Sequence, residues 1–191
     1  MNIIDQNQEK NAEEIKFLRH ELGIEAALEK VRARASSGKK ELTDINALAD
    51  EYLRLSYHGL RAKNRDFNAD FESHFEANLP KIEVVPQDIG RVLLNLINNA
   101  FQAVNEQSKK RIDEYKPTVS ASTQLNADSQ LLIAVKDNGP GIPDAIKDKI
   151  FQPFFTTKDT GKGTGLGLSL AYDIVKAHGG EINLWTKEGE G

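Results

Sequence analysis

Apolar residues recur every three or four positions along several stretches of the chain, as they do in helices that bury one face. The strongest pattern of this kind runs from Gln87 to about Asn105. At about 100° per residue, one side of this stretch gathers the apolar residues Ile89, Leu93, Leu96, Ile97, Ala100 and Val104. The opposite side gathers three carboxamides, at Asn95, Asn99 and Gln102. The pattern predicts a helix with one face in the core and a second face of uncharged polar groups.

Other stretches predict four further helices and five strands. The helices are expected over residues 11–35, 45–55, 145–150 and 166–178, and the strands over 67–71, 82–85, 118–123, 131–135 and 181–185. Thr43 or Asp44 can cap the second helix. Its buried face is expected to include Ile45, Leu48, Ala49, Tyr52 and Leu55. Because helices and strands are interleaved, and short links join some of the strands, we predict a mixed sheet with helices on one face.

The first 40 residues form a separate segment in this interpretation. Their apolar stripe passes through Ile15, Leu18 and Leu22, changes phase at Gly23, and ends in the polar stretch over 36–40. This is the pattern of a short coiled-coil-like helix, which would support weak homodimerisation. We therefore predict an N-terminal helical segment over residues 1–40 and a globular domain over 41–191.

The composition excludes several classes of protein. The chain has 191 residues, 39% of them hydrophobic and 28% charged, which suits one domain with an appendage and argues against wholesale disorder. Its net charge of -4 argues against nucleic acid as a partner. No apolar run approaches the roughly 18 residues of a membrane span, so we expect a cytoplasmic chain without direct membrane contact. The absence of cysteine excludes disulfides, thiolate nucleophiles and cysteine zinc sites.

An acidic glycine turn follows the strand predicted over 131–135. Asp137 stands at its start, and Gly139, Gly141 and Ile142 come directly after. A carboxylate at a strand end can accept a hydrogen bond from the exocyclic amine of a base, while glycines let the backbone approach the ring. The alternative interpretation is an ordinary Asx turn at the end of a strand.

A second glycine cluster runs directly into the last predicted helix. Its residues are Gly163, Thr164, Gly165, Leu166, Gly167 and Leu168. Glycines let backbone N–H groups converge on an anion, and a helix N-terminus favours negative charge. This segment is therefore predicted to bind a polyphosphate. Thr156 and Leu170 stand where the P-loop and dinucleotide patterns would each require a glycine, so neither pattern fits. A flexible linker is the alternative, and Lys162 is a candidate phosphate contact or a solvated loop lysine.

The segment between the clusters and the carboxamide face complete the candidate chemistry. Phe151, Phe154 and Phe155 suggest a lid anchored by aromatic packing, with plain core packing as the alternative. A carboxamide oxygen such as that of Asn99 or Asn95 is a suitable ligand for a Mg²⁺ ion that takes its other ligands from phosphate and water. The alternative for these asparagines is a solvated helix face.

Four short motifs in this order resemble the ATP-binding domain of sensor histidine kinases. They are residues 95–100, 137–143, 151–155 and 163–168, which resemble the N, G1, F and G2 boxes of that family. The similarity runs from about Thr43 to the C-terminus. The resemblance implies an α+β fold, the two-layer α/β sandwich shared with gyrase-type ATPases, here preceded by the N-terminal helix. The family usually adds another strand after this point, so we expect the last strand of the sandwich to be missing.

The resemblance also implies the cofactors ATP and Mg²⁺ and a role for each site residue. Asp137 would bind the adenine amine, and Asn99 would hold Mg²⁺ with Asn95 beside it. The segment from Phe151 to Gly167 would form the phosphate lid. The residues expected to contact the nucleotide are Asn95, Asn99, Asp137, Gly139, Gly141, Ile142, Phe154, Lys158, Gly163, Thr164, Gly165, Leu166, Gly167 and Leu168.

One position separates the chain from ATP-hydrolysing members of the superfamily, and two others depart from the histidine kinase pattern. ATP-hydrolysing relatives place a glutamate base where this chain has Asn95, and a carboxamide cannot take the proton from water, which favours phosphotransfer over hydrolysis. Many histidine kinases carry a lysine where this chain has Gln102, so phosphate neutralisation would depend on Lys158 and Lys162. Asn95 and Lys162 are the expected catalytic residues. His20 faintly resembles the phosphoacceptor, although a single helix of about 33 Å leaves no returning arm for the usual hairpin.

The expected function is therefore the ATP- and Mg²⁺-binding catalytic module of a two-component histidine kinase. It would present the γ-phosphate to a histidine, and that histidine would be His20 or would belong to another chain. A response regulator or a separate histidine-bearing acceptor is the expected partner. Two alternatives stay open: a nucleotide-binding regulatory module without catalytic output, and a serine kinase of the anti-sigma type.

Overall fold

The computed structural model describes residues 38–110, 114–158 and 163–191. Residues Gly38–Gly191 form one compact unit. The helix predicted over 11–35 lies outside the described residues, and the boundary near residue 40 stays a prediction. None of the helices in the described ranges combines the length and apolar character that a bilayer crossing requires.

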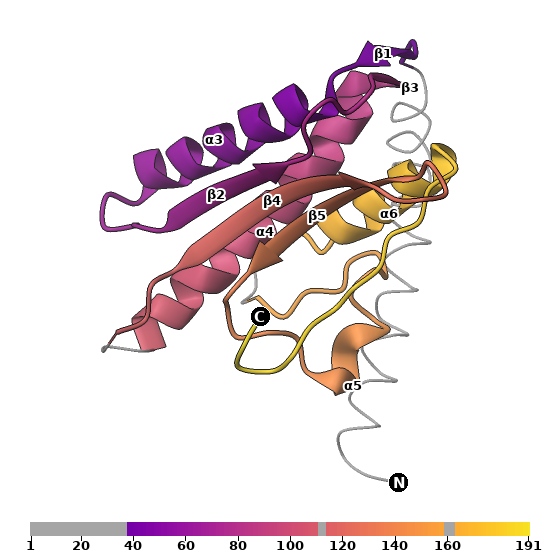
Figure 1. The fold of residues 1–191 in the computed structure, drawn as a ribbon. Coiled ribbons are helices and arrows are strands. Elements are labelled where there is room, and N and C mark those ends of the chain that lie inside the picture. Colours follow the sequence, from indigo (N-terminus) through magenta and orange to yellow (C-terminus); the bar gives the residue numbers. More distant parts are fainter. Residues whose placement is uncertain (1–37, 111–113, 159–162) are drawn as a thin grey trace, which may run out of the picture. The chain divides into compact units, whose positions relative to one another are not determined.

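A three-stranded sheet forms one layer of this unit (Figure 1). Its strands are β2 (Asp70–Phe75), β4 (Thr118–Leu125) and β5 (Leu131–Asp137), in the order β2-β4-β5. β2 runs parallel to β4, whereas β4 and β5 form an antiparallel hairpin. The predicted mixed sheet is therefore confirmed. The hairpin register places Val119 opposite Asp137, so the last residue of β5 is fixed by its pairing with a core residue at the start of β4.

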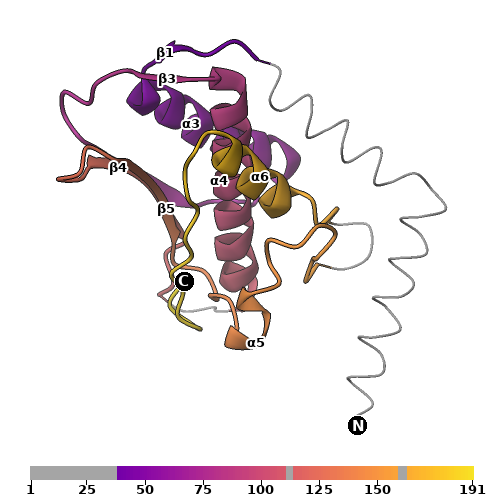
Figure 2. The same ribbon diagram turned by 90° about the vertical axis from the view of Figure 1, so that its right-hand side faces the viewer.

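Helices cover one face of the sheet and form the second layer (Figure 2). They are α3 (Ile45–Lys63), α4 (Pro86–Lys110) and α6 (Gly167–Ala177). α4 lies between the other two and contacts both of them, as well as β4 and β5. This arrangement confirms the predicted α+β sandwich, and it leaves α4 with one side toward the sheet and another side toward α6 and the loops.

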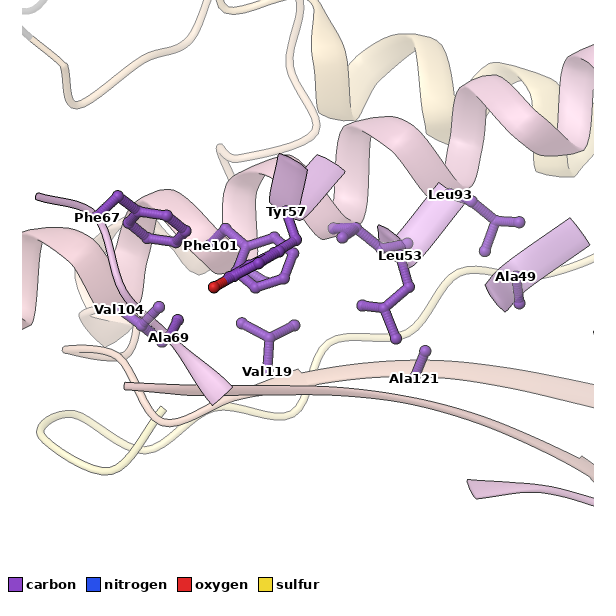
Figure 3. Close-up of a cluster of buried hydrophobic side chains, with 12 residues drawn as sticks. Ala49, Leu53, Tyr57, Phe67, Ala69, Leu93, Phe101, Val104, Val119 and Ala121 are labelled. Atoms are coloured by element: carbon purple, nitrogen blue, oxygen red, sulfur yellow. The ribbon is translucent and has the colours of Figure 1, made fainter. Parts of the chain in front are cut away.

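The core lies between the sheet and the helices α3 and α4 (Figure 3). Its buried members are Ala49, Leu53, Tyr57, Phe67, Ala69, Leu93, Ile97, Ala100, Phe101, Val104, Val119 and Ala121. Three aromatic rings meet in it, since the Phe101 centroid lies 5.9 Å from those of Tyr57 and Phe67. Close packing of this kind holds α4 in one rotational setting, because turning the helix would bring its polar side into the core.

The predicted faces of α4 agree with the structure. Leu93, Ile97, Ala100 and Val104 are buried, whereas the three carboxamide residues are half-buried on another side. The expectation for α3 is partly wrong, since Leu55 is 54% exposed and the buried side of α3 passes through Leu53 and Tyr57. Asp44 is the residue that caps α3, because its carboxylate accepts a hydrogen bond of 3.0 Å from the Ala47 amide.

Three elements differ from the prediction. The strand predicted over 67–71 shares only residues 70 and 71 with β2. β1 (Glu41–Thr43) pairs antiparallel with β3 (Ile82–Val84) in a small second sheet that the sequence pattern did not indicate. The strand predicted over 181–185 is wrong, because this segment is not paired with any strand of the described chain. Its successor Thr186 instead contacts the turn after β5, and Trp185 is 77% exposed. The short helix α5 (Asp144–Lys147) starts close to where it was predicted.

His178 fixes the end of α6 against the start of α4. Its Nε2 accepts a hydrogen bond of 3.3 Å from the Val85 amide, and its Nδ1 lies 2.9 Å from the Ile174 carbonyl oxygen. The helix ends at Ala177, and Gly179 two residues later has a φ of 76°, the left-handed conformation of a glycine C-terminal to a helix. The last turn of α6 is thereby held beside the start of α4.

Candidate functional site

Asp137 lies at the end of β5, where the strand leaves the sheet. Its Oδ1 accepts a hydrogen bond of 2.8 Å from the amide of Gly139. Burial raises the pKa of the Asp137 carboxyl above its ordinary value, and the hydrogen bond from Gly139 opposes this rise without cancelling it. The side chain keeps further acceptor capacity on its oxygens, so it can bind a donor from a ligand.

The turn after Asp137 packs directly on α4. A Cβ atom added to Gly139 would lie 2.9 Å from the Cβ of Ala103 and 2.7 Å from the Asp137 Oδ1. Only a residue without a side chain allows this approach of the turn to the helix. The acidic turn and the carboxamide side of α4 are therefore neighbours, since Ala103 lies about one helical turn after Asn99 on the same side of the helix.

Asn138 holds this turn to the segment before β4. Its Oδ1 accepts hydrogen bonds from the Thr118 amide at 2.8 Å and from the Tyr115 hydroxyl at 3.0 Å, and its Nδ2 donates to the Lys116 carbonyl at 2.8 Å. Asn138 was not assigned a separate role from the sequence. The signal that could have suggested one is its position, because an asparagine directly after a strand often bonds to nearby backbone groups.

Gly141 and Ile142 lie against the C-terminal residues. Gly141 has a φ of 71°, and a Cβ added to it would lie 2.4 Å from the Lys187 carbonyl oxygen. The Ile142 amide donates a hydrogen bond of 2.9 Å to the Thr186 hydroxyl, and the Lys147 ammonium contacts the Thr186 carbonyl at 3.4 Å. The segment after α6 thus supports the outer side of the acidic turn.

The second glycine cluster meets α4 at Asn95. Gly167 is the first residue of α6, and a Cβ added to it would lie 3.1 Å from the Asn95 Oδ1. The preceding residues are held locally, since the Leu166 amide donates to the Thr164 hydroxyl at 3.4 Å and the Ser169 hydroxyl donates to the Leu166 carbonyl at 3.1 Å. Leu168 is half-buried in the first turn of α6. The cluster and the carboxamide side of α4 are therefore brought together by the contact between α4 and α6.

The two ends of the predicted lid are joined by their backbones. Phe154 donates its amide hydrogen to the Gly165 carbonyl oxygen at 2.8 Å. Phe154 and Gly165 both have a positive φ, of 66° and 64°. Phe151 packs on α6, where its ring centroid lies 5.7 Å from that of Tyr172. The aromatic residues thus fix the root of the segment.

Lys158 crosses from this segment to α4. Its ammonium nitrogen lies 3.5 Å from the Asn99 Oδ1 and also donates a hydrogen bond to the Gln102 Oε1. Two of the three carboxamides on this side of α4 therefore contact one cation. Lys162, Gly161 and His20 lie outside the described residues.

A family model for histidine kinase-, DNA gyrase B- and HSP90-like ATPases matches residues 84–191 of the chain. The chain belongs to this family. Its matched part starts at the end of β3 and includes α4, the acidic turn, the lid segment and α6. The ATP-binding module expected from the four motifs is thereby confirmed.

Named histidine kinases are among the relatives of this ATPase module. The chain is 37% identical over 169 residues to "Signal transduction histidine-protein kinase AtoS" of Escherichia coli K12, covering 88% of this chain and 25% of that protein. It is 35% identical over 154 residues to "Sensor histidine kinase ZraS" of the same strain, covering 79% and 29%. It is 35% identical over 145 residues to "Sensory histidine kinase/phosphatase NtrB" of Rhizobium meliloti strain 1021, covering 73% and 36%. The chain therefore spans about a quarter to a third of these relatives.

Two solved structures share the fold of the module. The crystal structure of full-length ShkA in complex with AMPPNP superimposes with a TM-score of 0.67 at 20% identity, covering 83% of this chain and 31% of that one. The mycobacterial sensor histidine kinase MprB gives a TM-score of 0.51 at 24% identity, covering 68% of this chain and 76% of that one. At these identities the two structures support the sandwich itself and not the role of any residue.

The carboxamide side of α4 has the chemistry of a magnesium ligand. Within the described ranges, no group of three or more acidic or histidine side chains could hold a metal ion by itself. The Asn99 Oδ1 already faces a cationic group, the Lys158 ammonium, so its orientation fits such an ion.

Proposed function

We propose that the site residues bind Mg²⁺-ATP in the arrangement that the four motifs imply. Asp137 accepts a hydrogen bond from the adenine amine, while Gly139, Gly141 and Ile142 line the side of the base. The backbone amides of the run from Gly163 to Leu168 surround the phosphates at the start of α6. One observation carries this proposal: the acidic turn contacts α4 at Ala103, and the second glycine cluster contacts the same helix at Asn95.

Magnesium belongs to this proposal as an ion that carboxamide oxygens of α4 would hold and that would bind the nucleotide phosphates. Asn99 is the proposed ligand, and Asn95 lies beside it one helical turn earlier. Bound Mg²⁺ would neutralise part of the phosphate charge. The protein side chains then orient the nucleotide: Asp137 fixes the base at one end, and the lid residues Phe154 and Lys158 stand at the other.

The proposed reaction is transfer of the γ-phosphate to a histidine. A ring nitrogen of that histidine attacks the γ-phosphorus, the bond from this phosphorus to the bridging oxygen breaks, and ADP leaves with the electron pair. Lys162 would stabilise the charge on the transferred group. Asn95 cannot remove a proton from water, so it would position the nucleotide without promoting hydrolysis.

The acceptor histidine and the downstream partner are proposals for the whole protein. His20 is the candidate within this chain, and a histidine on another chain is the alternative. The named histidine kinases among the relatives support a response regulator as the protein that receives the phosphate next.

Phosphotransfer can be tested with γ-labelled ATP and Mg²⁺. We expect label on the protein, or on an added histidine-bearing acceptor domain, that is lost in acid and kept in base, as is typical of phosphohistidine. Loss of the label in His20→Ala would identify His20 as the acceptor, and its retention would exclude it. Acid-stable label on a serine, or nucleotide binding without transfer to any acceptor, would contradict the proposal.

A further inference from the structure

The Lys158 ammonium lies against two carboxamides of α4, one of which is the proposed magnesium ligand Asn99. Its nitrogen lies 3.5 Å from the Asn99 Oδ1 and donates to the Gln102 Oε1. A lysine ammonium has three donors and no acceptor, so in this place it satisfies oxygen ligands as a cation would. The two contacts connect positions 59 and 56 residues apart in sequence, and they join the lid segment to the carboxamide side of the helix.

The surrounding chain holds the stem of Lys158 in this position. The Lys158 amide donates a hydrogen bond of 3.2 Å to the Thr156 hydroxyl, which turns the backbone at this point. A Cβ added to Gly163 would lie 3.2 Å from the Lys158 Cδ and 2.7 Å from the Thr156 Oγ1. Gly163 therefore leaves the space that the lysine stem occupies. The backbone bond between Phe154 and Gly165 fixes the root of the same segment.

A lysine and a magnesium ion cannot share the Asn99 oxygen at low cost. Both are cations, and the repulsion between charges a few ångströms apart is strong where water is partly excluded. Magnesium binding would therefore move the Lys158 ammonium away from Asn99. Since Gln102 is uncharged, it accepts a hydrogen bond from this lysine, whereas a lysine at position 102 would repel it.

We propose that the Lys158 ammonium takes the place of the metal ion. It contacts the carboxamide side of α4 until nucleotide-bound Mg²⁺ displaces it. This inference rests on the proposed nucleotide site. Without metal, the ammonium lies beside the phosphates and offsets part of their charge. With metal, Mg²⁺ takes over at Asn99. Lys158 therefore makes nucleotide affinity less dependent on Mg²⁺, and it is a positioning residue that couples the metal to the lid segment.

The experiment measures the dissociation constant of the non-hydrolysable analogue AMPPNP by calorimetry, in Mg²⁺ and in EDTA. The wild-type chain is compared with Lys158→Met, which keeps the length of the stem and removes the charge. Lys63→Met, at an exposed lysine in the last turn of α3, is the matched control. We expect Lys158→Met to lose about tenfold in affinity in EDTA and to lose little in Mg²⁺, as suits the loss of one charge-assisted contact.

A second variant separates charge from hydrogen bonding. Lys158→Gln can still donate to Gln102 but carries no charge, and we expect it to behave like Lys158→Met. Equal losses in Mg²⁺ and EDTA would overturn the inference, because Lys158 would then be an ordinary phosphate ligand. Unchanged affinity in both solutions would also overturn it, since the contact with α4 would then be structural only. Failure of the wild-type chain to bind AMPPNP in either solution would be a different result, and it would refute the proposed function.

Discussion

Phe154 and Gly165 form a backbone hydrogen bond of 2.8 Å, and both have a positive φ. The two residues lie so close that a Cβ on Gly165 would be 2.3 Å from the carbonyl carbon of Phe154. A bulky residue with positive φ is unusual and persists only where the surroundings enforce it. The pair therefore sets the direction in which the lid segment leaves the sandwich and returns to α6.

Gly165→Ala should weaken nucleotide binding with little effect on the core. Alanine pays about 1–2 kcal/mol for the left-handed conformation, and here it also meets the backbone of Phe154. We expect at least about a tenfold loss of AMPPNP affinity by calorimetry, with an unfolding midpoint lowered by about 2–8 °C. Gly179→Ala is the control, because Gly179 has a φ of 76° but nothing lies within 4 Å of its added Cβ. Equal binding by the two variants would show that the Phe154 contact does not matter.

Asp137→Asn should weaken nucleotide binding without weakening the fold. The asparagine Oδ1 can still accept the Gly139 hydrogen bond, but its amide group would present a donor to the donor of the adenine. We expect a loss of about tenfold or more in AMPPNP affinity. Asp128→Asn, at an exposed aspartate in the β4–β5 turn, is the control and should bind like wild type. Normal binding by Asp137→Asn would refute the role of this carboxylate.

The raised pKa of the Asp137 carboxyl predicts that the free energy of unfolding depends on pH. Burial raises the folded-state pKa of Asp137 above the unfolded value of about 3.9, so between these two pKa values the folded state holds more protons. The contribution of Asp137 to the free energy of unfolding is therefore greatest at low pH and falls as pH rises through this interval. Thermal unfolding should show Asp137→Asn more stable than wild type at pH 7, with a gap that narrows in acid. A gap that widens in acid would contradict this sign.

Asn99→Ala should remove the effect of Mg²⁺ on nucleotide affinity. If Asn99 is the protein ligand of the metal, AMPPNP should bind this variant about equally in Mg²⁺ and in EDTA. Asn98→Ala is the control, because it removes the same type of side chain one position earlier in α4. It should keep the wild-type difference in AMPPNP affinity between Mg²⁺ and EDTA. A full Mg²⁺ effect in Asn99→Ala would assign the metal to another group.

Asn95→Glu should introduce water-directed hydrolysis. A carboxylate at this position can accept a proton from an attacking water, and general bases contribute about 10²–10⁴-fold to such reactions. We expect phosphate release from ATP to rise by at least about tenfold. Asn95→Gln has the same length without the base, and it tests whether the longer side chain fits beside Gly167. An equal rate of phosphate release in Asn95→Glu and Asn95→Gln would refute the proposal that Asn95 favours transfer over hydrolysis.

Periodicity predicted those parts of the molecule in which one helix or strand has a clear inside and outside. α4 is the best case, because its buried positions and its carboxamides fall on different sides at a constant angle. β1 was missed because its three residues hold one large apolar side chain, Leu42, whereas the equally short β3 has an apolar residue at each end. The segment over 181–185 alternates as a strand does, yet a strand also needs a partner, and side-chain pattern alone cannot show whether one is within reach.

The candidate site was predictable in its parts and only partly in its connections. Local spacing indicated the acidic turn and the glycine run, because each lies within a few residues of sequence. The contact of Lys158 with Gln102 depends on how a loop and a helix meet across the domain, and no local pattern encodes it. The position of Asn138 directly after β5 suggested backbone bonding, but its partners Thr118 and Lys116 depend on how the segment before β4 meets this turn.

The pairing of Val119 with Asp137 links recognition to correct assembly of the hairpin. If β5 slipped by one position against β4, every side chain of β5 would change faces, and the carboxylate would turn away from the helix layer. A molecule with the shifted register could still be compact, but Asp137 would no longer stand where it is proposed to accept the adenine amine. Nucleotide would therefore bind and stabilise only the molecules with the native β4–β5 register, and it would raise their share of the refolded protein.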